Sequence, residues 1–224
     1  ILPRGNWLDD SGEIVLPGVP AFMGVREPRK ADRLDRLDLA EWLTDPKDGS
    51  GGLTARVFAN RLWYLFFGEG LSPSLEDFGG QGQPPNNRPL LDNLATALLE
   101  NGWSIKKTVR LIVTSRAYRQ SSLVSPKLAN LDIENQWFGR QARYRLPAEM
   151  LRDNALFISG LLQQGDSFSF AKPYQPAGYY RHLNFPTRKY KHDSNQNQWR
   201  RGVYLHWQRQ FLHPMMKAMD APSR

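Results

Sequence analysis

Cysteine is absent from the 224-residue sequence. Disulfide bonds, thiolate metal sites and a Cys-x-x-Cys-His haem attachment are therefore excluded within these residues, although this absence does not indicate a cellular compartment. Long apolar runs are absent too, so no segment has the roughly 20 apolar residues that a membrane-spanning helix needs. The opening residues ILPRGNWLDD do not have the pattern of a signal peptide. Because both ends are abrupt, we expect the native polypeptide to extend beyond Ile1 and Arg224.

The sequence also lacks the short motifs of well-known catalytic and metal sites. It contains no Gly-x-Ser-x-Gly, no Gly-rich loop followed by Lys-Ser/Thr, and no His-x-x-x-His or His-Glu-x-x-His. We therefore predict no metal site in this chain and keep the adjacent His192 and Asp193 as a secondary candidate pair. Glu69, Glu76 and Asp77 could supply paired carboxylates for glycoside hydrolysis, but helix caps and loop hydrogen bonds are the favoured interpretation.

Apolar residues recur at helical spacing through the middle of the chain. They predict four helices packed on one core that buries Trp63 and Trp103, and these helices cover residues 54–67, 89–101, 104–118 and 147–162. In the first helix, Phe58 and Leu65 are expected to face inward and Asn60 outward.

Shorter or less regular elements are predicted on both sides of this region. Residues 33–45 predict a helix with an apolar inner face, formed by Leu34, Leu37, Ala40 and Leu43. Residues 131–139 predict another short helix. In the helix at 147–162 we expect Met150 and Ile158 near the inner face. Its first turns carry Glu149, Arg152 and Asp153, for which an ion pair of Arg152 or Arg145 with a carboxylate is favoured over a catalytic role. Alternating residues from Gly202 to Trp207 predict one short strand.

Together these elements predict a mainly α fold, an irregular helical domain with long ordered loops and at most a short strand or small sheet. Residues 1–53 are expected to form an extended segment with one short helix, and residues 54–163 the helical core. Residues 164–224 are expected to form a basic, aromatic arm that packs on the core, because their many aromatic side chains have apolar area to bury. We expect one domain overall.

The net charge of +8 is unevenly distributed. Residues 181–224 carry nine Lys and Arg residues against two Asp residues, a net charge of +7, and residues 103–120 carry five cations and no acid. This asymmetry predicts an anionic partner, although a solvated basic face is the simpler alternative. We predict that cations of the arm form an anion- or partner-binding surface with neighbouring aromatic residues, namely Arg181, Arg188, Lys189, Lys191, Arg200, Arg201 and Arg209 with Tyr190 and Trp199.

Several segments resemble one protein family: Asn60-Arg61-Leu62-Trp63, Phe67-Gly68-Glu69-Gly70-Leu71, Asp77-Phe78-Gly79, Gly102-Trp103-Ser104 and Tyr118-Arg119-Gln120-Ser121-Ser122. They are similar to the DUF1553 (PSD1) domain, and the resemblance covers nearly the whole chain. It implies a domain of large exported proteins of planctomycetes and related bacteria, which usually also contain a DUF1549 domain and often a cytochrome c domain. Export to the periplasm or cell surface is therefore expected, and haem could be bound by another domain. The resemblance implies no catalytic residues.

These observations predict a non-catalytic binding and assembly module of an exported, cytochrome-associated surface protein. It would contain no cofactor or membrane span, and it would dock to other domains or chains of the same assembly or to an acidic polysaccharide. One alternative is part of a hydrolase or redox enzyme that acts on polysaccharide. Another is a nucleic-acid-binding protein, which charge alone favours.

Overall fold

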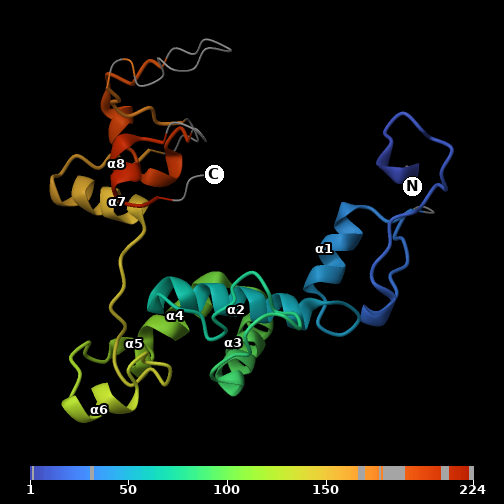
Figure 1. Ribbon diagram of the computed structural model, residues 1–224, viewed down its shortest axis with the longest axis horizontal. Helices are drawn as coiled ribbons and strands as arrows, with labels where there is room; N and C mark the ends of the chain where they lie inside the picture. The colour runs from blue at the N-terminus through green and yellow to red at the C-terminus, as the bar shows by residue number, and fades with distance from the viewer. Residues whose placement is uncertain are drawn as a thin grey trace. The chain divides into compact units, whose positions relative to one another are not determined.

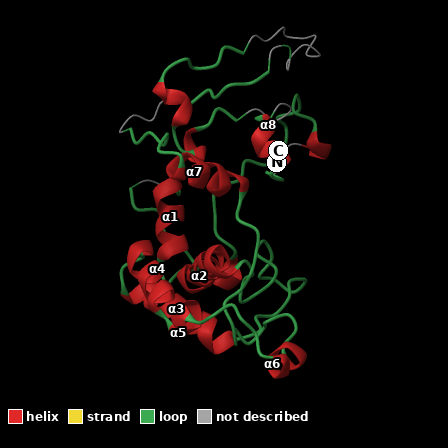
Figure 2. Ribbon diagram, turned by 90° about the vertical axis from the view of Figure 1, so that its left-hand side faces the viewer, coloured by secondary structure: helices red, strands yellow, loops and turns green. Residues whose placement is uncertain are grey.

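The computed structural model describes residues 1, 3–30, 33–165, 170–176, 178, 190–207 and 212–221. Within these residues it contains eight α-helices and no β-sheet, which confirms the predicted mainly helical fold (Figures 1 and 2). None of the helices in this part of the chain is long and apolar enough to span a membrane. The chain divides into two compact units, Ile1–Tyr144 and Arg145–Arg224, a boundary that differs from the segment boundaries expected from sequence.

The elements of the first unit are 3₁₀ helices η1 (Pro3–Gly5) and η2 (Ala21–Met23), followed by α1 (Arg36–Thr44), α2 (Gly51–Phe67), α3 (Arg88–Glu100), α4 (Ile105–Thr114), α5 (Arg116–Arg119) and α6 (Pro126–Leu131). Those of the second unit are α7 (Ala148–Ile158), η3 (Gln196–Trp199), η4 (Gly202–Tyr204) and α8 (Pro214–Ala218).

The core of the first unit lies among α2, α3 and α4. Trp63 is 2% exposed and stacks on Phe67 with ring centroids 3.9 Å apart, and Phe138 meets both rings edge-on. Leu98 from α3 and Ile112 from α4 are each 1% exposed and complete this apolar cluster. The burial predicted for Trp63 is confirmed, whereas Trp103 is only partly buried.

A buried amide holds the long loop after α2, and this reverses the predicted outward position of Asn60. The Asn60 side chain is fully buried, with its Oδ1 accepting from Ser72 N and its Nδ2 donating to Ser72 O, both at 2.9 Å. Gly70 is required beside it, because a Cβ there would lie 2.4 Å from Ser72 O and 2.8 Å from Asn60 Nδ2. Phe58 and Leu65, which were expected inside, are 45% and 48% exposed. The face of α2 that is buried instead contains Ala55, Ala59, Asn60, Leu62, Trp63 and Phe67.

Local capping residues set the helix ends. Asp35 caps α1, whose buried residues are Asp38 and Trp42, so the prediction of Leu37 and Leu43 as inner residues is wrong. Helix α2 begins after Ser50 rather than at Thr54, because Gly51 allows a close approach to Asp45.

The predicted helix over 104–118 is interrupted at Ser115. This residue is extended, with ψ of 155°, and its Oγ accepts from Tyr118 N, so that α5 starts as a new short helix. The helix predicted at 131–139 is also wrong. Helix α6 lies earlier because Ser125 caps it and Pro126 fits its first position. Residues 132–139 instead form turns, in which the Asp132 carboxylate accepts from two backbone N–H groups.

The second unit is built around α7. Its buried residues are Ala148, Arg152 and Leu156, while the expected inner residues Met150 and Ile158 are 48% and 79% exposed. The strand predicted at 202–207 is replaced by η4 and a single bridge between Leu205 and Ala171.

We expect Asn60→Ala to lower the free energy of unfolding by about 2–4 kcal/mol, because it leaves two buried backbone groups of Ser72 without partners. Urea denaturation measures this change. Asn93→Ala, at an exposed position of α3, is the matched control and should change stability by only about 0.5 kcal/mol. Equal stabilities of the two variants would contradict the proposed role of the amide.

Candidate functional site

Four cations of the predicted arm surface, Arg181, Arg188, Lys189 and Arg209, lie outside the described residues. Of the remaining members, Lys191 and Arg201 are exposed, whereas Tyr190 and Trp199 are partly buried. The Tyr190 hydroxyl donates to Pro173 O at 2.8 Å, so this phenol ties two segments of the arm together.

Arg200 is buried and contributes to the fold of the second unit. Its side chain is 4% exposed, and its guanidinium lies over the Tyr204 ring at 4.1 Å from the centroid. The neighbouring Arg152 is also 4% exposed and donates to the backbone oxygens of Arg200 and Gln198 at 2.6 and 2.9 Å. The Arg152 pKa is lowered by burial, a shift that Asp153 partly opposes. Because a buried guanidinium cannot meet a partner at the surface, Arg200 is not available to the predicted arm surface.

Asp193 fixes the local structure of the arm rather than pairing with His192. Its Oδ2 accepts from Lys172 N and from Asn197 Nδ2, both at 2.8 Å, while its backbone N donates to Lys172 O. The His192 ring contacts the Asp193 backbone oxygen through Nδ1 at 3.0 Å. Among the described residues, no group of three His, Asp or Glu side chains is placed to hold a metal ion.

His213 is held from both sides of its ring. Nδ1 accepts from Met215 N at 3.2 Å, so the proton is on Nε2, which donates to Tyr174 O at 3.1 Å. Burial, together with the nearby charge of Arg152, lowers the pKa of His213. The ring lines an apolar cavity of about 680 Å³ with Arg152 and Trp199. Both nitrogens already have partners, which assigns His213 to stabilising α8 rather than to transferring a proton.

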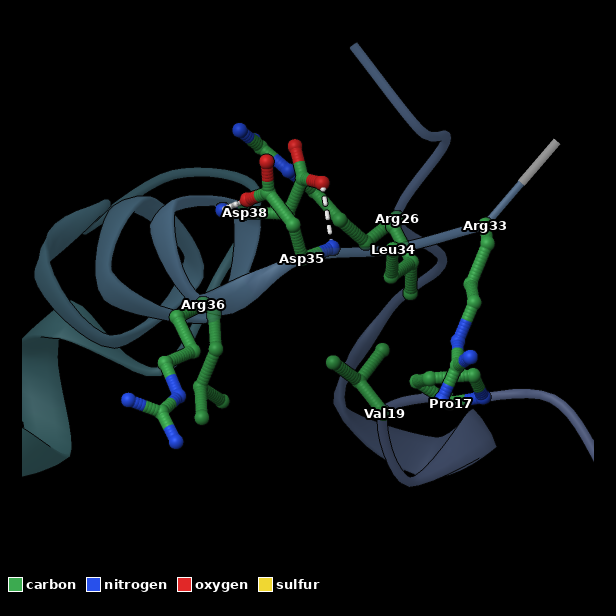
Figure 3. A pocket seen from close by; sticks show the side chains of 10 residues that line it. Pro17, Val19, Arg26, Arg33, Leu34, Asp35, Arg36 and Asp38 are labelled. Atoms are coloured by element: carbon green, nitrogen blue, oxygen red, sulfur yellow. Dashed lines mark hydrogen bonds between the residues drawn. The ribbon is translucent and has the colours of Figure 1, made fainter. Parts of the chain in front are cut away.

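A second cavity, of about 520 Å³, lies beside the start of α1 (Figure 3). Asp38 lines it and is 2% exposed. Its carboxylate accepts from Asp35 N and from Arg29 Nε, both at 2.8 Å. The hydrogen bond from Asp35 N is the main cause that lowers the pKa of Asp38, with Arg29 adding to it. Arg33 and Arg36 lie at different edges of the cavity in Figure 3, so these cations do not converge on one ligand atom.

Helices α4 and α5 carry a surface on which all the charged side chains are basic. All five cations that the sequence places between residues 103 and 120 are exposed: Lys106, Lys107, Arg110, Arg116 and Arg119. No carboxylate within the described ranges forms an ion pair with them. At 3.6 residues per turn, the three cations of α4 occupy an arc of roughly 100°, and the buried Thr108 and Ile112 lie on the other side.

Two carboxylates on α7, for which the sequence favoured an ion pair over a catalytic role, line a cavity. Glu149 and Asp153 are one helical turn apart and line a cavity of about 560 Å³ with Arg201 and Trp207. No sequence signal could have joined them, because Arg201 and Trp207 come from a segment about 50 positions later. The predicted ion pair of Arg145 or Arg152 with a carboxylate is confirmed. Arg145 pairs with Asp220, and Arg152 Nη1 lies 3.9 Å from Asp153 Oδ1, although Arg152 also donates to two backbone oxygens.

Comparison with known proteins relates the chain to one family. The PSD1 family model, described as "Protein of unknown function (DUF1553)", matches residues 35–224. Neither the curated proteins nor the solved structures gave a match.

Protonation of His213 should destabilise the fold at mildly acidic pH. Because the pKa of His213 is lowered in the folded state, the unfolded chain binds the proton first, near pH 6.5, and the free energy of unfolding falls as pH drops below that value. His213→Asn keeps an acceptor for Met215 N and should make this dependence shallower between pH 7.5 and 5. Denaturation at each pH measures the slope, and His192→Asn, at an exposed position, is the control. Equal slopes for His213→Asn and the unmodified chain would contradict the assignment.

Proposed function

Because the chain belongs to the PSD1 (DUF1553) family, whose function is unknown, its own geometry has to indicate a role, and we propose that it is a non-catalytic binding and assembly module. It docks through a basic surface to an acidic polysaccharide, and the same surface can meet an acidic neighbouring domain of its own protein. The proposal places the module in an exported, cytochrome-associated protein, as the family resemblance implies.

The observation that carries the proposal is the charge arrangement on α4. Lys106 and Lys107 lie in the first turn of the helix, which contains no acid. Positive charge is unfavourable there, because the helix macrodipole already places partial positive charge at its N-terminus. Lys106 and Arg110 are also like charges at i and i+4, which further destabilises the helix. A surface that costs stability in this way is typical of a binding surface.

The surface also has the exposure that binding requires. Its five cations lie on two consecutive helices, and their side chains reach solvent. A single exposed ion pair contributes only about 0–1 kcal/mol. Several cations acting on one polyanion add to each other and increase the association rate, so both affinity and rate should fall as salt increases.

The double reversal Lys106→Glu with Arg110→Glu tests the proposal. It should weaken binding to a sulfated or uronic glycan by about tenfold or more at low salt, equivalent to roughly 1.4 kcal/mol. The fold should be retained, and the Glu at position 106 should stabilise α4 by about 0.3–1 kcal/mol through the macrodipole. Titration calorimetry at low and moderate salt measures the affinity, and thermal denaturation measures stability.

The matched control is Lys47→Glu with Lys127→Glu, which changes the net charge equally at exposed positions outside α4 and α5. This control should lose little affinity. Glycan binding that falls equally in both double variants would show a net-charge effect and no specific surface. Tighter binding to duplex DNA than to any acidic glycan would favour the nucleic-acid alternative and overturn the proposal.

A further inference from the structure

The cavity between α7 and η4 is lined by both acidic and basic side chains. Glu149 and Asp153 extend from consecutive turns of α7, while Arg201 comes from the residue before η4 and Trp207 from the segment after it. Arg201 is exposed, and within the described residues it forms no ion pair with either carboxylate. The cavity volume of about 560 Å³ falls within the range of about 300–1,000 Å³ that small-molecule sites occupy.

The floor of this cavity is held by a close approach of two backbones. Gly202 lies against α7, where an added Cβ would be 2.9 Å from Glu149 Cβ and 3.1 Å from Glu149 Cα. Gly202 N donates to Asp153 Oδ1 at 2.6 Å. Asp153 is therefore oriented by the backbone of η4, and its second oxygen remains available as an acceptor. A carboxylate fixed before binding loses less entropy when a ligand arrives.

Trp207, the aromatic residue that lines the cavity, is held in place by packing. Trp207 is partly buried and packs against a small apolar cluster that includes Leu205 and Met216, which are 6% and 0% exposed. This packing holds the indole at the cavity, with Met150 and Val203 adding apolar surface. An indole whose one side is supported by the core presents a flat apolar surface at low entropic cost.

We infer that this cavity binds an uncharged sugar unit. Sugar hydroxyls donate to carboxylates and accept from a guanidinium, so a polyol uses Glu149, Asp153 and Arg201 together. The apolar C–H face of the ring packs on Trp207. A sulfate or uronate would be repelled by the two carboxylates, and an amine, although attracted by them, would leave Arg201 without a partner. A neutral polyol with one apolar face fits all four side chains.

This site is independent of the basic surface on α4 and α5. It adds recognition of a neutral sugar unit to a module proposed to bind acidic glycan. The probes are glucose, galactose, mannose, N-acetylglucosamine and their disaccharides, titrated into the full 224-residue chain. Saturation-transfer NMR detects binding and calorimetry gives the affinity.

We expect at least one neutral sugar to bind, and Arg201→Gln and Glu149→Gln each to weaken it by about tenfold, since hydrogen bonds to charged groups are lost. Arg201 is exposed, so its replacement should leave the fold unchanged. Lys191→Gln, at another exposed position of the second unit, is the matched control and should bind normally. The double reversal at Lys106 and Arg110 should also bind neutral sugar normally, which separates failure of this inference from failure of the proposed function.

Three results would overturn the inference. The first is that none of the neutral sugars binds. The second is that a sugar binds but Arg201→Gln and Glu149→Gln leave its affinity unchanged. The third is that a diamine such as cadaverine binds in place of sugar and is lost in Glu149→Gln, which would make the cavity a cation site.

Discussion

The pair of hydrogen bonds between the Asn60 side chain and the Ser72 backbone is the constraint on which the first unit depends. An amide offers one acceptor and one donor, and Ser72 supplies the matching donor and acceptor at 2.9 Å each. The loop between α2 and α3 is fastened at this point, and Ser72 Oγ continues the connection by donating to Gln83 O. Helix α3 then begins at a fixed place, because Asn86 N donates to Leu71 O just before the helix.

The direction in which the basic surface faces depends on how α3 ends and α4 begins. Helix α3 ends at Glu100, Gly102 follows with a left-handed φ of 64°, and Ser104 then caps α4. The cap, together with burial of Thr108 and Ile112, fixes the rotation of α4, so Lys106, Lys107 and Arg110 face outward. Packing on one side of a short helix thus determines where its charges are presented on the other.

The sequence predicted helix positions better than helix faces, for a physical reason. Caps and apolar spacing are local, so α3 and α4 begin at Arg88 and Ile105, each within one residue of the predicted starts at 89 and 104. The faces of α1, α2 and α7 depend on a buried polar side chain in each: Asp38, Asn60 and Arg152. Asn60 and Arg152 find their partners in later segments of the chain, whereas Asp38 is bonded to the nearby Asp35 and Arg29. Hydropathy assigns all three side chains to the surface.

The two candidate sites differ in the same way: one is formed by residues close in sequence, and the other by residues far apart in sequence. The cations of α4 and α5 are close together in sequence, so the charge pattern indicated a basic segment there, although the binding surface was predicted in the arm. The α7 cavity could not be predicted, because Gly202 has to approach Glu149 before Arg201 and Trp207 reach the carboxylates. Arg200 and Arg201 are adjacent and identical in type, yet one is buried and the other exposed. Only tertiary contacts distinguish them.

The end of the first unit has a consequence for proteolysis. Tyr144 is fastened to the last turn of α2, because its hydroxyl donates to Leu65 O at 3.0 Å and its ring lies where a Cβ of Gly68 would be, 2.5 Å from Tyr144 Cγ. Burial raises the Tyr144 pKa, so the phenol keeps its proton at neutral pH. The flanking Arg143 and Arg145 are exposed, but a trypsin-like protease needs several residues in an extended, detached conformation. Cleavage between the two units therefore requires release of Tyr144 from α2, and a side chain at position 68 would make the junction susceptible.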